Sequence, residues 1–361
     1  MRVLIRTDGG GCIGSGHVGR CLVLALALRQ RGAVCRFAMR ALPGHLGERV
    51  SAQGFGVDLL AEPAGSGWSV VADAQAFEAL AAEFDPSLVI VDHYGLDARW
   101  EAAVAGGKRR LLAIDDLADR PHACDILLDQ NHHADAKGRY AGLIPNGAAT
   151  FLGPEYALTH PSFAVARGMV RHASRRVERV FVFYGGTDAS NETARALAVL
   201  ARPDLRHLAV DVVVGRNHPD PDVLARLASR RGKTRIYSER PHLADLLVRA
   251  DLAFGAGGVT TWERCALGVP SVVTTVAGNQ EPGIEVLSAA GIVQYAGAAG
   301  QLCEDGLHAS VRALLDSPGR LEAMRQAALA MTDGGGAKKL ACRLIPEQTP
   351  PACESAQEAA P

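Results

Sequence analysis

Short runs of apolar residues recur along the first half of the chain, and each is followed by a loop and a segment with helical periodicity. The runs lack the strict alternation of a half-exposed strand, so they predict strands of a parallel sheet covered on both faces. The intervening segments predict right-handed crossover helices, the first over residues 17–31 and ended by Gly32. The strands are expected at residues 2–7, 33–39, 57–60, 88–91, 111–114 and 126–128.

The same pattern restarts in the second half, after a stretch near residues 156–176 in which proline, glycine and a basic run interrupt it. Two successive series of this kind predict an α/β protein with two Rossmann-like, doubly wound domains that face each other across a cleft. The second-half strands are expected at residues 180–184, 210–214, 252–254 and 271–276, and the helices from about 191, at 221–230 and 243–249, from about 259, and at 281–289, 301–315 and 319–331.

The interruption divides the chain into domains of the usual size. The boundaries that we expect are an N-terminal domain at 1–158, a linker at 159–176 and a C-terminal domain at 177–340. Residues 341–361 are predicted to form a disordered tail, because the end of the chain is rich in proline, alanine, glutamate and glutamine.

Composition narrows the possible partners. The 361 residues include 38 basic and 39 acidic side chains, a net charge of −1, so no global charge attracts nucleic acid or an anionic membrane. No apolar run is long enough to span a membrane, and the N-terminus lacks a signal-peptide core, so we expect a cytoplasmic protein. The 8 cysteines form no CxxC pair and are expected to be reduced, with Cys12, in a glycine-rich loop, the one to watch.

That glycine-rich loop, residues 8–17, joins the first strand to the first helix. Glycines allow a ligand to approach the backbone closely, and the helix start offers free N–H groups. No acidic residue follows the second strand, which ends at Arg40, so a nicotinamide cofactor is disfavoured. His17 lies at the helix start, where the positive end of the helix disfavours the imidazolium. A neutral imidazole there suits a general base, although a lone histidine can also be structural.

Two polar segments that begin with an aspartate follow strands of the first half. Asp92-His93-Tyr94 could cap and pack the strand end, or could contact substrate. Asp115 and Asp116 could hold a metal or share a proton, or could cap the next turn. For Asp116 we favour the capping role.

The second half contains two glycine-rich turns that lead into helices, at residues 185–188 and 255–261. Two such helix starts suit a diphosphate held without a metal ion, and the first could be capped by Asp188, Ser190 or Asn191. Glu263, one turn into the second helix, could accept hydrogen bonds from ribose hydroxyls or could simply favour the helix dipole. Asn279 and Gln280 follow a strand and are candidate contacts to a sugar.

An ordered set of motifs over residues 1–340 resembles PseG-type proteins, the UDP-2,4-diacetamido-2,4,6-trideoxy-β-L-altropyranose hydrolases of pseudaminic acid biosynthesis. The segments that carry the resemblance are GSGHVGR at 14–20, VDHYG at 91–95, IDD at 114–116, CDILLDQN at 124–131, GGTD at 185–188, GGVTTWE at 257–263 and GNQ at 278–280. The family is similar in fold to glycosyltransferases of the B type. One departure is Thr159-His160, where the family pattern has Leu-Arg, and it would change the contacts of the linker.

The resemblance implies a metal-independent hydrolysis without a cofactor, in which water attacks the anomeric carbon with inversion and UDP leaves. It implies an N-terminal catalytic and sugar domain and a C-terminal UDP-binding domain, with His17 activating the water. The substrate-binding residues expected from the loops and the resemblance are Asp8, Gly14, Gly16, Arg20, Tyr94, Gly186, Thr187, Gly257, Gly258, Thr260, Glu263, Asn279 and Gln280. No nucleic-acid partner is expected, and the chain should be a monomer or a weak homo-oligomer.

Three alternatives stay open at this point. The same scaffold could transfer the sugar to an acceptor other than water, as a glycosyltransferase. It could hydrolyse another UDP- or CMP-linked amino sugar. It could also be a sugar-nucleotide binding subunit without activity, which would not need His17.

Overall fold

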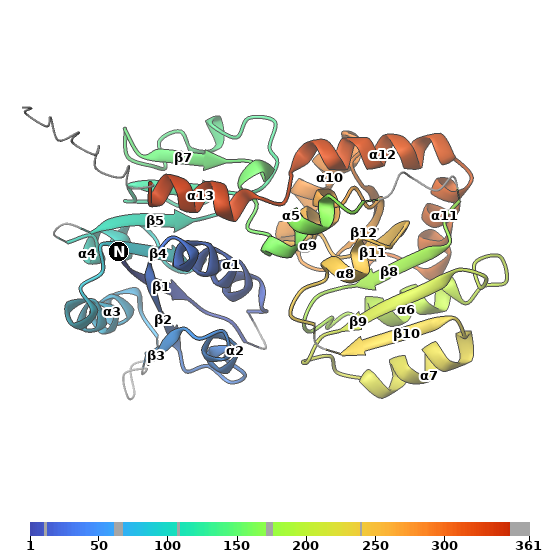
Figure 1. Ribbon diagram of the computed structural model, residues 1–361, viewed down its shortest axis with the longest axis horizontal. Helices are drawn as coiled ribbons and strands as arrows, with labels where there is room; N and C mark the ends of the chain where they lie inside the picture. The colour runs from blue at the N-terminus through green and yellow to red at the C-terminus, as the bar shows by residue number, and fades with distance from the viewer. Residues whose placement is uncertain (11–12, 61–67, 107–108, 171–175, 239, 347–361) are drawn as a thin grey trace, which may run out of the picture.

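Two parallel β-sheets, each flanked by helices, form the two halves of the chain in the computed structural model (Figure 1). The structure describes residues 1–361 except 11–12, 61–67, 107–108, 171–175, 239 and 347–361. The first sheet has 7 strands in the order β3-β2-β1-β4-β5-β6-β7, and the second has 6 in the order β10-β9-β8-β11-β12-β13. In both sheets the strand order reverses beside the first strand, as in doubly wound folds. The predicted fold class is confirmed.

The first half contains the strands expected from the apolar runs and one more, β7. Its elements are β1 (Arg2–Thr7), α1 (Gly16–Gln30), β2 (Val34–Arg40), α2 (Gly47–Ala52), β3 (Gly56–Leu60), α3 (Val70–Phe84), β4 (Leu88–Asp92), α4 (Ala98–Val104), β5 (Arg110–Ile114), β6 (Ile126–Asp129), η1 (Gly138–Tyr140) and β7 (Ala149–Leu152).

The second half adds β10 and β13 at its two edges to the strands that were expected. Its elements are β8 (Arg179–Phe183), α6 (Glu192–Leu200), β9 (Ala209–Val214), α7 (Pro221–Arg231), β10 (Thr234–Ser238), α8 (Ala244–Leu247), β11 (Leu252–Gly255), α9 (Thr260–Ala266), β12 (Ser271–Thr275), η3 (Gly278–Gln280), α10 (Glu281–Ala289), β13 (Gln294–Ala298), α11 (Glu304–Leu315) and α12 (Pro318–Met331).

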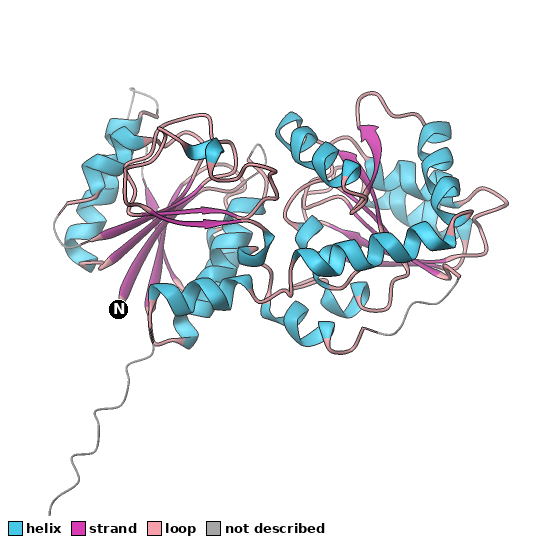
Figure 2. Cartoon of the chain, turned by 90° about the horizontal axis from the view of Figure 1, so that it is seen from above, coloured by secondary structure: helices cyan, strands magenta, loops and turns pink. Residues whose placement is uncertain are grey.

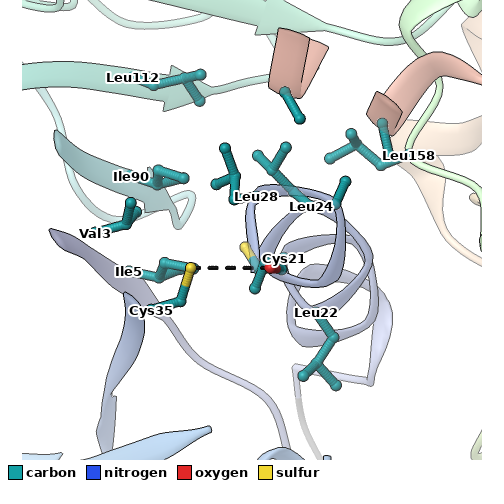
Figure 3. Close-up of a cluster of buried hydrophobic side chains, with 14 of the residues drawn as sticks. Val3, Ile5, Cys21, Leu22, Leu24, Leu28, Cys35, Ile90, Leu112 and Leu158 are labelled. Carbon is teal, nitrogen blue, oxygen red and sulfur yellow. Dashed lines mark hydrogen bonds between the residues drawn. The ribbon is translucent and has the colours of Figure 1, made fainter. Parts of the chain in front are cut away.

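The central strands of the first sheet are buried and helices cover both faces, as the uninterrupted apolar runs predict (Figure 2). Helix α1 covers one face, where Leu24 and Leu28 pack against strand residues such as Ile5 and Ile90 (Figure 3). Helices α3 and α4 cover the other, where Phe77 packs edge-on against a buried tryptophan, with ring centroids 4.9 Å apart. Because helices cover both faces and the strands are parallel, the loops that follow the strands lie together at one edge of the sheet.

Two segments cross between the halves and lie against each other. The first contains η2 (Pro154–Tyr156) and α5 (Pro161–Arg167), and the second leads into α13 (Gly336–Leu344). The hydroxyl of Thr159 donates to the carbonyl of Gly334 over 3.1 Å. His160 caps α5 by accepting the N–H of Ser162. Thr159 thus fastens the crossing, and His160 starts the helix.

The expectation of a disordered tail over 341–361 is wrong at its beginning. Helix α13 extends to Leu344, and Leu340, Ala341 and Leu344 are buried against α1 in the first core. The helix is apolar on one face only. Three glycines at its start, residues 334–336, weaken the helical signal in the sequence. Residues 347–361 lie outside the described part of the chain.

Among the described residues, no helix is long and apolar enough to cross a membrane. The described cysteines are free thiols, and Cys21, Cys35, Cys124 and Cys265 are buried. Cys12 lies outside the described residues.

Candidate active site

The carboxyl edge of the first sheet brings together polar residues that are far apart in the sequence. Strand β1 pairs with β4 so that Thr7 lies opposite Asp92, and β4 pairs in turn with β5. Helix α1 starts above the same edge. The edge therefore gathers His17 and Arg20 from the helix with Asp92 and Tyr94 from the end of β4.

His17 and Asp92 form a buried pair. Nδ1 of His17 lies 2.6 Å from Oδ1 of Asp92, and their side chains are 11% and 0% exposed. Burial alone would raise the pKa of Asp92, but Arg20 and His17 hold that pKa well below its ordinary value. An ionised carboxylate can only accept hydrogen bonds, so Nδ1 of His17 is the donor. The other ring nitrogen, Nε2, is then free of a proton in the neutral ring and can accept one.

Arg20 completes this pair. Its Nε and Nη2 atoms each lie 2.6 Å from an oxygen of Asp92, and its Nη1 lies 2.9 Å from Oδ2 of Asp116. The side chain is only 3% exposed. Because the fork of the guanidinium is filled by two carboxylates, Arg20 is placed to orient Asp92 and not to meet a phosphate.

Tyr94 lies beside His17 and faces the other half of the chain. The two rings pack edge to face, with centroids 4.6 Å apart and planes at 84°. The phenol oxygen of Tyr94 accepts from Nδ2 of Asn279 over 3.3 Å. Burial and Asp116 raise the pKa of Tyr94, so the phenol keeps its proton. Two residues predicted for the sugar site, from opposite halves, thus meet next to His17.

Asp8 lies at the same edge but is enclosed by the protein. Its carboxylate is 1% exposed, and it contacts Arg6 at 2.6 Å, Arg40 at 2.6 Å and His93 at 3.2 Å. Burial would raise its pKa, but these partners lower it far below the ordinary value. With its oxygens occupied by protein cations, Asp8 is placed to shape the loop and not to contact a ligand.

The glycines of the first loop set its shape. Gly14 has a φ of +82°, a conformation that favours glycine, and exchanges backbone hydrogen bonds of 2.8 and 3.1 Å with Gly10. Gly16 is the first residue of α1. The loop thus closes on itself and directs His17 to the sheet edge.

The two aspartates after β5 have separate roles, and the capping role belongs to Asp115 instead of Asp116. Asp115 accepts the backbone N–H of Ala118 over 2.8 Å and pairs with Arg120, while Asp116 pairs with Arg20. Among the described residues, no group of three histidine, cysteine or carboxylate side chains is arranged to hold a metal ion.

The first glycine-rich turn of the second half is capped by Asp188, one of the three capping residues that we expected, so its helix start is not a free anion site. The carboxylate of Asp188 accepts the backbone N–H groups of Glu192 and Thr193, each over 2.9 Å, so it caps the start of α6. A phosphate would have to displace a carboxylate there. Gly186 of the same turn lies at the contact with the first half, because a Cβ on Gly186 would be 3.2 Å from the Ser15 hydroxyl, and Thr187 is the next residue of the turn.

The side chain of Gln280 fastens the second glycine-rich turn. Its Oε1 accepts the N–H groups of Gly257 and Val276, each over 3.1 Å. A Cβ on Gly257 would lie 2.6 Å from Cγ1 of Ile284, so the turn requires glycine. Gly258 follows in the turn and Thr260 begins α9, where its hydroxyl accepts from Arg264 over 3.1 Å. Gln280 thus supports the turn through its side chain.

Glu263 is the carboxylate of this turn without a protein partner. Its Oε2 is buried and makes no hydrogen bond. Burial raises the pKa of Glu263 to about 7, although Arg264 and Arg49 act in the opposite direction. A buried oxygen without a hydrogen bond is costly. A ligand hydroxyl would satisfy it, which fits the ribose interpretation better than a helix-dipole role alone.

Asp92, Asp116, Asn131 and Trp262 are site residues that the sequence did not single out for these roles. Nε1 of Trp262, in the second half, donates to Oδ1 of Asn131 in the first over 3.3 Å. All but Trp262 follow or end strands, which is the signal that could have indicated them. Their partners lie 72 to 131 residues away, and no pattern in the sequence identifies such pairs.

Comparison with known proteins agrees with the resemblance. No protein-family profile matches the chain. The chain is 28% identical over 253 residues to the UDP-2,4-diacetamido-2,4,6-trideoxy-beta-L-altropyranose hydrolase of Campylobacter jejuni, a match that covers 68% of this chain and 81% of that one. It is 26% identical over 281 residues to an uncharacterised protein of Methanocaldococcus jannaschii, which covers 76% of this chain and 55% of the relative. This chain thus spans little more than half the length of the latter protein.

The fold has close counterparts among solved structures. MurG of Acinetobacter baumannii superposes with a TM-score of 0.69 at 13% identity, and the match covers 95% of this chain and 99% of that one. The similarity confirms the glycosyltransferase-B fold.

Proposed function

We propose that the protein hydrolyses UDP-2,4-diacetamido-2,4,6-trideoxy-β-L-altropyranose to UDP and the free sugar. The observation that carries the proposal is the buried His17–Asp92 pair, beside Tyr94, whose phenol meets Asn279 of the second half. The Campylobacter jejuni relative supports the choice of substrate and of water as acceptor.

In the proposed reaction, Nε2 of His17 removes a proton from water as the oxygen attacks the anomeric carbon. The bond between that carbon and the phosphate oxygen breaks, and its electron pair leaves with UDP. A single displacement of this kind inverts the anomeric configuration. Asp92 holds the ring with Nδ1 protonated and stabilises the imidazolium that forms.

The C-terminal half binds UDP in this proposal. The Gly257 turn is held by Gln280 and precedes Glu263, whose unpaired buried oxygen is available to the ribose hydroxyls. Gly258 and Thr260 lie between them at the start of α9. The capped start of α6 is a poorer place for phosphate, so the diphosphate is assigned to the second turn.

Tyr94 and Asn279 contact the sugar in this proposal. Tyr94 lies beside His17 and meets Asn279 of the proposed UDP-binding half, so the two residues mark the place where the anomeric carbon has to be in this proposal. The proposal also includes that the protein is cytoplasmic and is a monomer or a weak homo-oligomer. It includes that the reaction uses no metal and no cofactor.

A glycosyltransferase is the second candidate, because the fold is similar to that of MurG. The two are separated by incubating the purified protein with the UDP-sugar alone and following free UDP and reducing sugar by NMR. The hydrolase releases both without an acceptor, and EDTA leaves the rate unchanged. A protein that releases neither until an acceptor is added is a transferase.

A further inference from the structure

Three consecutive residues at the end of β6 connect three separate parts of the molecule. Asp129 accepts from the hydroxyl of Tyr140 over 3.1 Å. The side-chain oxygen of Gln130 accepts the N–H of Leu158, at the start of the crossing segment, over 3.0 Å. Asn131 accepts from Trp262 in the other half over 3.3 Å. This motif carries part of the family resemblance, and the proposed reaction assigns it no task.

Asn131 is held rigidly. Its own N–H donates to Oδ1 of Asp129 over 2.9 Å, and the two residues before it are 1% and 2% exposed. The carboxamide therefore projects from a fixed strand end, and this makes it a good reference point for an element of the other half.

Trp262, in the second half, is the donor of this hydrogen bond. It is 3% exposed and packs with Ala157, Cys265 and Ile284. A buried indole N–H needs an acceptor, and here the acceptor comes from the first half of the chain. Trp262 belongs to α9, and the next residue along that helix is Glu263.

We infer that Asn131 is a positioning residue that acts through Trp262 to hold α9, and so Glu263, in place for the nucleotide. The inference rests on the proposed function, since it takes Glu263 to be the ribose contact. With the Tyr94–Asn279 contact it makes a second hydrogen bond from the carboxyl edge of the first sheet to a ligand-binding element of the second half. The N-terminal half thereby contributes to nucleotide affinity without touching the nucleotide.

The test is a double-mutant cycle on UDP affinity, measured by calorimetry on the full chain. Asn131→Ala and Trp262→Phe should each raise the Kd for UDP about 3–10-fold, the usual effect of one hydrogen bond. The double variant should be no weaker than the weaker single variant. Asn131→Asp keeps the acceptor oxygen and should restore near-normal affinity. Asn146→Ala, an exposed asparagine of the same half, should change nothing.

Unchanged affinity in the double variant, or losses that add up, would overturn the inference. A wild-type protein that does not bind UDP would contradict the proposed function instead. In that case the Asn131–Trp262 contact between the two halves is judged by small-angle scattering of the free proteins. It predicts a larger radius of gyration for the double variant than for the wild type, and equal radii would overturn it.

Discussion

Nδ1 of His17 lies 2.6 Å from Oδ1 of Asp92, although 75 residues separate them in the sequence. The distance follows from the fold, because α1 starts above the edge at which β4 ends. The contact changes the interpretation of both residues. Asp92, considered from the sequence as a strand-end cap or a substrate contact, pairs with Nδ1 of His17 and leaves Nε2 as the nitrogen that the proposed reaction uses.

Replacing His17 by asparagine or alanine should reduce kcat about 10²–10⁴-fold, the usual contribution of a general base. The measurement is the rate of UDP release at saturating UDP-sugar, together with circular dichroism to confirm folding. Near-normal turnover of a folded variant would remove His17 from this role.

Asp92→Asn should lower kcat roughly 10²-fold or more while KM changes little, because the amide no longer imposes the correct tautomer on His17. Asp125→Asn is the matched control. Asp125 is an aspartate of the same half that accepts the N–H of Leu111 over 2.8 Å, at the opposite end of the sheet. Equal effects of the two variants on kcat would argue against a positioning role for Asp92.

Asp8→Asn should act on stability and not on substrate binding. Removing its charge leaves Arg6 and Arg40 buried with less compensation, a change that typically costs about 3–5 kcal/mol in the free energy of unfolding. Urea denaturation measures this, and Asp58→Asn serves as the control. Asp58 pairs with Arg36 at 2.6 Å in a more exposed place, where about 1 kcal/mol or less is at stake. A stable Asp8→Asn protein with a raised KM would restore the predicted substrate contact.

Glu263→Gln should stabilise the free protein at high pH and weaken UDP binding. The pKa of Glu263 rises from 4.5 to about 7 in the folded state. Between these values the unfolded chain loses the proton and the folded protein keeps it, so the free energy of unfolding falls as pH rises. Glutamine removes this fall, so the Tm of the variant should exceed that of the wild type at pH 8, with the gap narrowing towards pH 5.

The second part of this prediction concerns affinity. Loss of hydrogen bonds from ribose hydroxyls to a carboxylate should raise the Kd for UDP about 10–100-fold at pH 8. Glu192, whose pKa burial also raises to about 7, is present in both proteins and cancels in the comparison. A variant that gains Tm at pH 8 and binds UDP normally would show that Glu263 is buried without serving the ribose.

The apolar pattern was sufficient for the central strands of both sheets and for their parallel arrangement, because those strands are covered on both faces. It was not sufficient at the sheet edges. β10 (TRIYS) and β13 (QYAGA) are partly exposed and mix polar and small residues, so their apolar signal is weak. The tail prediction failed at α13 for a different reason, since the partner that makes this helix stable is α1, more than 300 residues earlier.

The candidate site, too, could be predicted from the sequence only in part. Strand ends and glycine turns indicated His17, Tyr94 and Asn279, which the structure brings together, and also Glu263, whose role at the site stays a prediction. These patterns could not reveal that Asp8 and Arg20 use their charges on protein partners, and they gave Asp188 only as one of three possible caps of α6. Which partner satisfies a charge depends on contacts between distant segments, and these exist only in the folded chain.

The measurement that tests the central claim most directly is the reaction of the UDP-sugar in water enriched in oxygen-18, without an acceptor, with mass spectrometry of the UDP formed. If water activated by His17 attacks the anomeric carbon, the carbon–oxygen bond breaks and UDP is released without label, at a rate that His17→Asn strongly reduces. UDP that carries the heavy isotope would place the attack at phosphorus and contradict the account.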